Sequence, residues 1–122
     1  MLAGQNFLNA LINDIRNVFL VGCMATGKTS VGKVLAQRLD WPLVDTDHEI
    51  QRRVGKTIPE IFRDDGESAF RRLESSVIEE LCAGAGQVIA SGGGAFIEEE
   101  NRLRMLSSGR VVCLDARPET II

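Results

Sequence analysis

The sequence has little of what marks several classes of protein. Its 122 residues carry one histidine, three cysteines and a net charge of only −3. The weak acidic charge argues against nonspecific nucleic-acid binding, which needs a basic surface. Cys23, Cys82 and Cys113 are odd in number and widely spaced, and they include no C-x-x-C pair. This pattern argues against a disulfide framework or a zinc site, and it predicts free thiols in a reducing, cytoplasmic compartment.

Long apolar runs are also missing. No stretch approaches the roughly 18 apolar residues that a membrane span needs, so we expect no membrane partner. Residues 1–16 lack the basic leader of a signal peptide and are predicted to form a short amphipathic extension, packed on the domain or on a partner. Its apolar residues share one helical face: Phe7, Leu8, Leu11, Ile12 and Ile15.

What is present is an ordinary globular composition, with 44% hydrophobic and 25% charged residues, which predicts one domain over residues 17–122. Strand and helix patterns alternate after the extension, which predicts an α/β fold with helices on both faces of a parallel sheet. The predicted strands cover 18–21, 42–45, 87–90 and 110–114. The predicted helices cover 28–39, 47–54, 57–62, 67–82 and 98–106.

The last residues, 115–122, have the pattern of a strand end followed by the start of a helix, with Pro118 in its first turn. A helix of one turn is not stable alone. The chain then ends on two isoleucines, and apolar termini are unusual on a finished domain. We therefore expect the chain to be a fragment of a longer protein.

The stretch from Gly22 to Thr29, GCMATGKT, fits the phosphate-loop pattern G-x-x-x-x-G-K-[ST]. Gly22 and Gly27 let the backbone turn so that its N–H groups surround phosphates, Lys28 reaches the β- and γ-phosphates, and the Thr29 hydroxyl is placed to bind Mg²⁺. A strand pattern precedes the loop and a helical pattern follows it. This context favours nucleotide binding over a glycine-rich turn that binds nothing.

Two more stretches follow predicted strands, where ligands gather in α/β sheets. Asp45 and Asp47 suit a metal ligand and a group that orients or deprotonates a hydroxyl, although Asp47 is also placed to cap the next helix. Three glycines within Ser91–Ala95 leave a backbone that another molecule can approach closely, although a flexible strand-to-helix turn is the better explanation of this stretch taken alone.

Arg71 lies beside the apolar Phe70, with Glu67 four residues before it and Glu74 three residues after it. This spacing suits a guanidinium held ready for a substrate carboxylate. The alternative is a solvated pair of helix side chains, worth a few tenths of a kcal/mol. His48, the only histidine, is expected at the surface, because phosphoryl transfer depends on positioning and charge neutralisation more than on a histidine base.

These motifs, in this order and spacing, resemble those of the shikimate kinases over residues 17–114. The resemblance rests on Gly22–Thr29, Asp45-Thr46-Asp47, Ile61-Phe62, Gly66-Glu67, Phe70-Arg71-x-x-Glu74 and Gly92–Gly94. It implies a three-layer α/β/α kinase fold of the nucleoside monophosphate kinase type. The implied activity is transfer of the γ-phosphoryl group of ATP to the 3-hydroxyl of shikimate, with Mg²⁺, in aromatic amino-acid biosynthesis.

The resemblance also implies a role for each candidate residue. Thr29 and Asp45 would serve Mg²⁺, and Lys28 and Asp47 would be catalytic, with Asp47 binding the shikimate hydroxyls as the candidate base. The implied ATP-binding residues are Gly22, Cys23, Met24, Ala25, Thr26, Gly27, Lys28, Thr29 and Ser30. The implied shikimate contacts are Asp47, Arg71 to the carboxylate, Glu74 steadying that arginine, Gly92, Gly93 and Gly94 along the ring, and Phe62 and Phe70 as walls.

The sequence departs from the family pattern in two places. Ala25 stands where the family usually has glycine, and the family's lid, second substrate arginine, last strand and adenine-contacting loop have no counterpart before Ile122. We therefore expect a monomeric kinase fold without lid and last strand, nearly inactive as these 122 residues alone. Two alternatives stay open: another small-molecule P-loop kinase, such as a gluconate kinase, and a noncatalytic nucleotide-binding module.

Overall fold

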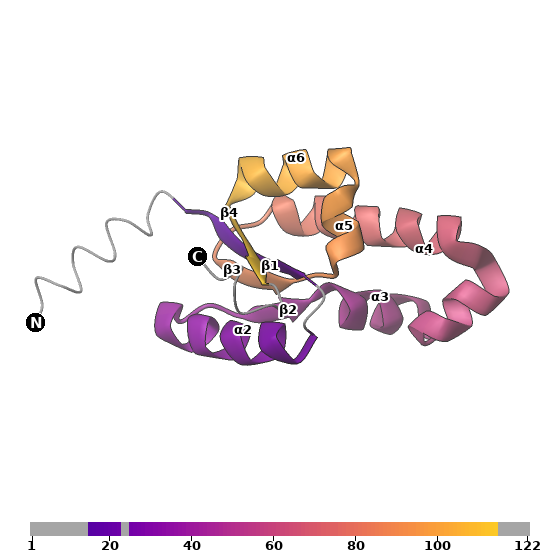
Figure 1. Cartoon of the computed structure of the whole chain (residues 1–122), viewed down its shortest axis with the longest axis horizontal. Helices are drawn as coiled ribbons and strands as arrows, with labels where there is room; N and C mark the ends of the chain where they lie inside the picture. The colour runs from indigo at the N-terminus through magenta and orange to yellow at the C-terminus, as the bar shows by residue number, and fades with distance from the viewer. Residues whose placement is uncertain (1–14, 23–24, 115–122) are drawn as a thin grey trace, which may run out of the picture.

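The computed structural model describes residues 15–22 and 25–114, in which strands and helices alternate (Figure 1). Most of the predicted N-terminal extension and the predicted helix start at Pro118 lie outside these residues. The strands are β1 (Asn17–Gly22), β2 (Leu43–Asp45), β3 (Gln87–Ala90) and β4 (Arg110–Leu114). The helices are α2 (Ala25–Leu39), α3 (Thr46–Val54), α4 (Ile58–Cys82), α5 (Gly93–Ile97) and α6 (Glu99–Ser108).

The four strands form one parallel sheet in the order β2-β3-β1-β4, which confirms the predicted parallel sheet. β1 lies inside the sheet, where Phe19 pairs with Ile89 of β3 on one side and with Val111 of β4 on the other. Because the strands are parallel, their carboxyl ends meet at one edge. The phosphate loop, which follows β1, and the aspartate pair, which follows β2, therefore come together at this edge.

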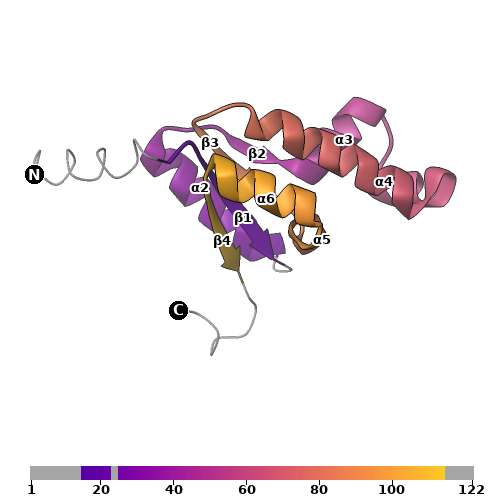
Figure 2. The same cartoon turned by 90° about the horizontal axis from the view of Figure 1, so that it is seen from above.

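Alternate residues of β1 supply the cores on the two faces of the sheet, which confirms three layers. Val18 and Leu20 pack with Ala36 of α2 on one face. Phe19 and Val21 pack on the other face against α4, α5 and α6. Burying each large apolar side chain stabilises the fold by roughly 1.5–3 kcal/mol, so this alternation fixes which face each helix covers. Figure 2 shows α4 and α6 side by side, and α3 with the first part of α4 extending to one side of the sheet.

Helix α3 starts one residue earlier than predicted, and its cap is different. The alternative interpretation of Asp47 as the helix cap is wrong, because the Asp45 side chain accepts hydrogen bonds from the backbone N–H groups of Asp47 and His48. Asp47 lies instead in the first turn, where a carboxylate is stabilised by the helix dipole. Gly55, with φ 76°, ends the helix in the left-handed region that glycine tolerates.

Helix α4 joins the two helices predicted on either side of Gly66. Thr57 and Glu60 form the predicted capping box at its start, with side chain and backbone bonded reciprocally. Gly66, at φ 87° and ψ 169°, interrupts the helical backbone and bends the element. The predicted break is therefore a kink, and it sets the direction of the part of α4 that carries Arg71.

Helix α5 was not predicted. Gly93 and Gly94 open it, although glycine is a poor helix former. The helix forms because Ala95 is fully buried in the core cluster that contains Phe19 and Met105. Helix α2 also differs from its prediction. It begins at Ala25, three residues before the predicted start, so the end of the phosphate loop is already helical.

Gly109 gives a stability prediction, because a Cβ there would lie 2.0 Å from the backbone oxygen of Asn17 and 2.7 Å from its carbonyl carbon. Gly109→Ala is expected to lower the free energy of unfolding by about 2–4 kcal/mol, since backbone has no easy way to move aside. Gly92→Ala is the matched control, because nothing lies within 4 Å of its Cβ position. Urea unfolding of both variants tests this, and equal stabilities would contradict it.

Candidate active site

A small cavity of about 80 Å³ lies at the carboxyl edge of the sheet. It brings together the phosphate loop, the aspartate pair and the start of the glycine run, three motifs that are far apart in the sequence. The lining residues are Lys28, Thr29, Asp45, Asp47, Ala90, Ser91 and Gly92. The structure therefore brings these three motifs together, as the sequence predicted.

Lys28 extends from α2 across this cavity, and its ammonium group donates a hydrogen bond to the backbone oxygen of Ser91 at 2.9 Å. The Ser91 side chain is buried, and its hydroxyl has no hydrogen-bond partner in the part of the chain that the structure describes. Sequence analysis did not single out Ser91. The signal that could have identified Ser91 as a site residue is its position between strand β3 and the glycine run, because that position faces the phosphate loop.

Asp45 and Thr29 share the cavity and fit a magnesium site. Both cap bonds to helix α3 end on Oδ1 of Asp45, which leaves Oδ2 for a metal ion or its water. No group of three histidine, cysteine, aspartate or glutamate side chains forms a metal cluster within residues 15–22 and 25–114. Mg²⁺ in kinase sites takes one or two protein oxygens and fills its remaining positions with phosphate oxygens and water, so this donor set fits.

Burial and three charged groups act on the carboxyl group of Asp47. Partial burial raises the pKa of its carboxyl group, and the neighbouring Asp45 carboxylate raises it further. Lys28 and Arg71 act in the opposite direction and favour the ionised form. A carboxylate with a raised pKa is a better proton acceptor than a free one, and it lies beside the two cations that a phosphoryl acceptor site needs.

Arg71 is held from three sides. Its Nη1 donates to Oε1 of Glu74 at 2.8 Å, its Nε lies 3.7 Å from Glu67, and its guanidinium lies 5.3 Å from the centre of the Phe70 ring. Glu74 is only 2% exposed. Burial raises the pKa of Glu74 while Arg71 opposes the rise, and the bond to Glu74 raises the pKa of Arg71. The solvated pair considered from sequence therefore does not describe Arg71 and Glu74, because one partner is buried.

The glycine run approaches both Arg71 and the phosphate loop. A Cβ on Gly94 would lie 2.7 Å from Nη1 of Arg71, and a Cβ on Gly93 would lie 4.0 Å from the backbone of Gly22. Arg71 is also close enough to Asp47 to lower its pKa. The structure thus links Arg71 to the cavity through Asp47 and the glycines.

Phe62 and Phe70 stack beside this arginine, on either side of the kink in α4. Their ring centroids are 4.9 Å apart at an interplanar angle of 31°. Phe70 is buried, whereas Phe62 is 39% exposed. The cavity itself is not lined by either ring, so their predicted role as pocket walls stays a prediction.

The phosphate loop is described in part. Gly22 ends β1 at φ 137°, and a Cβ there would lie 2.0 Å from the backbone oxygen of Leu114, so only glycine fits. Cys23 and Met24 lie outside the described residues. The backbone of Ala25 and Thr26 forms the first turn of α2, followed by Gly27, Lys28, Thr29 and Ser30. The nucleotide contacts implied for these residues stay predictions.

Comparison with known proteins decides the family. A family model described as shikimate kinase matches residues 24–122. The chain belongs to the shikimate kinase family. It is 49% identical over 105 residues to the shikimate kinase of Symbiobacterium thermophilum, and 47% identical over 108 residues to that of Ralstonia nicotianae.

Solved shikimate kinases have the same fold. The crystal structure of the Aquifex aeolicus enzyme matches 84% of this chain with a TM-score of 0.78 and 40% identity. The Acinetobacter baumannii enzyme, solved in complex with shikimate, matches 90% of this chain with a TM-score of 0.81 and 42% identity. The α/β kinase fold predicted from the motifs is therefore confirmed.

The chain spans only part of these relatives. The match covers 86% of this chain but 60% of the Symbiobacterium enzyme, and 88% of this chain but 57% of the Ralstonia enzyme. The two solved shikimate kinases are covered to 61% and 62%.

No helix among the described residues has the length and apolar character that crossing a bilayer requires.

Proposed function

We propose that the protein to which this chain belongs transfers the γ-phosphoryl group of ATP to the 3-hydroxyl of shikimate. The observation that carries the proposal is the single cavity shared by Lys28, Thr29, Asp45 and Asp47, with Arg71 close enough to act on Asp47. A relative solved in complex with shikimate supports the choice of substrate. The protein is proposed to work as a monomer in the cytoplasm.

In this mechanism the residues bind and orient more than they react. Lys28 binds the β- and γ-phosphates. Thr29 and Asp45 would hold Mg²⁺, which would neutralise phosphate charge when bound. Asp47 accepts the proton of the 3-hydroxyl as the new oxygen–phosphorus bond forms and the bond to the β-phosphate oxygen breaks, which leaves ADP. Asp47 then returns the proton to solvent. Arg71 binds the shikimate carboxylate, with Glu74 fixing its guanidinium.

The direct test is an assay of the chain, and of any longer product of its gene, with ATP, Mg²⁺ and either shikimate or gluconate. Formation of shikimate 3-phosphate supports the proposal. Preferential phosphorylation of gluconate supports the other small-molecule kinase instead. Calorimetry that shows ATP binding without shikimate binding supports a noncatalytic nucleotide-binding module.

Arg71 separates shikimate from substrates that lack a carboxylate. Arg71→Ala is expected to weaken shikimate binding about a hundredfold, because a charge-assisted bidentate contact is lost, and Arg71→Lys restores only part of it. Arg72→Ala is the matched control, because Arg72 is exposed on the same helix. An unchanged affinity for shikimate in Arg71→Ala would show that the carboxylate assignment is wrong.

Gly94 tests the placement of that arginine without removing it. A Cβ at Gly94 would lie 2.7 Å and 2.8 Å from the two terminal nitrogens of Arg71, so Gly94→Ala displaces the guanidinium while the fold accommodates the change. We expect kcat/KM for shikimate to fall roughly ten- to a hundredfold. In an Arg71→Ala background the same substitution is expected to add little, because the two changes act on one contact. Full additivity in steady-state kinetics would contradict this.

A further inference from the structure

Helix α5 carries the glycine run, but little within the helix itself fixes its position. It has five residues, and the two that open it, Gly93 and Gly94, are poor helix formers. Gly92, at its N-cap position, has no side chain to cap it, and Glu98, which follows it, has extended backbone. A helix this short is not stable alone. Ala95 is buried in the core, so contacts from other elements must fix the two ends of α5.

One such contact comes from the first turn of α6. The Nη1 atom of Arg102 donates to the backbone oxygen of Ile97 at 3.2 Å and to that of Phe96 at 3.5 Å. These two carbonyls end α5, so they have no partner within that helix. Basic side chains can cap a helix by bonding to its last carbonyls. Arg102 therefore fixes the end of α5 that is opposite to the glycine run.

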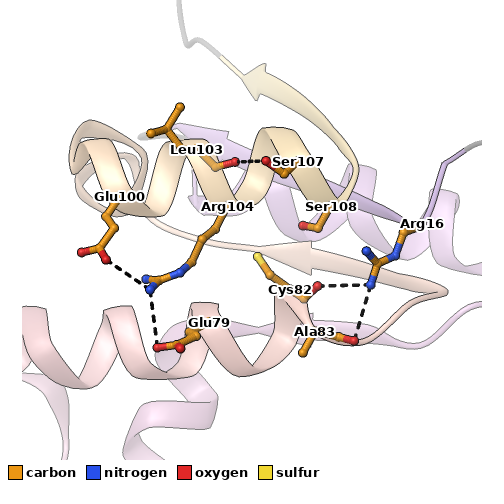
Figure 3. Close-up of a pocket in the computed structure, with 9 residues that line it drawn as sticks. All are labelled: Arg16, Glu79, Cys82, Ala83, Glu100, Leu103, Arg104, Ser107 and Ser108. Carbon is orange, nitrogen blue, oxygen red and sulfur yellow. Dashed lines mark hydrogen bonds and ion pairs between the residues drawn. The ribbon is translucent and has the colours of Figure 1, made fainter.

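The guanidinium of Arg102 has no competing acid. None of the ion pairs among residues 15–22 and 25–114 involves Arg102. Arg104, on the same helix, differs: Figure 3 shows it bonded to Glu79 and Glu100, beside a groove between α4 and α6. A hydrogen bond from a charged donor is stronger than a neutral one, so the two bonds from Arg102 can hold a marginal helix.

The other end of α5 lies in the candidate active site. A Cβ on Gly93 would lie 4.0 Å from the backbone of Gly22, which starts the phosphate loop, and one on Gly94 would lie 2.7 Å from Nη1 of Arg71. The start of α5 thus lies between the groups proposed to bind the phosphates and the shikimate carboxylate. Since α5 is a single turn, a small change at its end would shift the glycine backbone against Arg71.

We propose that Arg102 is a positioning residue, which holds α5 so that Gly94 leaves the guanidinium of Arg71 in place for the shikimate carboxylate. This inference rests on the proposed function for its substrate, and on the two backbone bonds for the way in which Arg102 acts. Arg102 does not line the cavity that holds Lys28 and Asp47, so it acts through α5 and not by touching the reacting groups.

The first test measures the hold on α5 and needs no substrate. Arg102→Met keeps most of the side-chain stem and removes its donors, so amide hydrogen exchange at residues 93–97 is expected to become at least about fivefold faster, with no change in α2. Arg104→Met is the matched control, because it removes the same charge from the same helix away from α5. Unchanged exchange in α5 of Arg102→Met, or faster exchange throughout the chain, would overturn the proposal.

The second test measures the affinities of the 122-residue chain for shikimate and for ATP by calorimetry. Arg102→Met is expected to weaken shikimate binding about five- to tenfold and to leave ATP binding within about twofold, because only the carboxylate site is displaced. Arg102→Lys, which can still donate to one carbonyl, is expected to recover part of the loss. Arg104→Met is expected to leave both affinities unchanged. An unchanged affinity for shikimate in Arg102→Met would overturn the proposal.

Gly94 shows whether Arg102 acts through α5. In a Gly94→Ala background, where Arg71 is already displaced, Arg102→Met is expected to weaken shikimate binding by less than about twofold. Fully additive losses would overturn the proposal. If the unaltered chain bound ATP but not shikimate, the proposed function would fail, whereas faster exchange at residues 93–97 in Arg102→Met alone would still confirm that Arg102 holds α5.

Discussion

Lys28→Met is expected to reduce kcat/KM for ATP-dependent phosphorylation of shikimate by about a thousandfold, which corresponds to about 4 kcal/mol of transition-state stabilisation. Methionine keeps most of the length and packing of the lysine stem, so the change removes the charge and the hydrogen bond to Ser91 with little loss of packing. Lys28 lines the cavity with Thr29, Asp45 and Asp47. Without its ammonium group, two carboxylates would face the phosphates with Arg71 as the remaining cation acting on Asp47.

The same substitution has a readout on the 122-residue chain that needs no turnover. The affinity for ATP, measured by calorimetry, is expected to fall at least about tenfold, because a charge-assisted contact to phosphate is lost. Lys33→Met is the matched control, since Lys33 is exposed on the same helix and does not line the cavity. Equal losses in both variants would trace the effect to net charge and not to the phosphate contact.

The sequence was sufficient for the elements whose residues show a clear period or a defined spacing. Alternation of strand and helix patterns along the chain predicted a parallel sheet with helices on both faces. The phosphate-loop spacing predicted the edge at which the site lies. Asp45, Asp47 and Lys28 share one cavity for the same reason, because parallel strands end together.

The features that sequence analysis missed depend on contacts between distant residues. Helix α5 contradicts the helix propensity of its two glycines, and it forms because Ala95 is buried between β1 and α6. The cap of α3 falls on Asp45 because strand β2 ends there, which no local pattern distinguishes from Asp47. The bond from Lys28 to Ser91 joins residues 63 positions apart, so only the folded chain places it.

Asp47→Asn is expected to lower kcat for shikimate phosphorylation by about a hundred- to ten-thousandfold with little change in KM for ATP. Asparagine has nearly the same shape but accepts no proton, so the 3-hydroxyl would have to lose its proton to water. Partial burial and the Asp45 carboxylate both raise the pKa of Asp47, which strengthens it as a proton acceptor over an exposed aspartate. Steady-state kinetics with each substrate varied in turn separates kcat from the two KM values.

The control for this variant is Asp40→Asn, because Asp40 is exposed and its φ of 57° is a conformation that asparagine tolerates well. It removes the same charge outside the cavity and is expected to leave kcat within about twofold. Thermal unfolding of Asp47→Asn checks the fold, since the loss of a carboxylate from the first turn of α3 costs only about 0.3–1 kcal/mol. If kcat fell less than tenfold in a folded Asp47→Asn protein, the hydroxyl proton would leave by another route, and Asp47 would serve only to orient the acceptor.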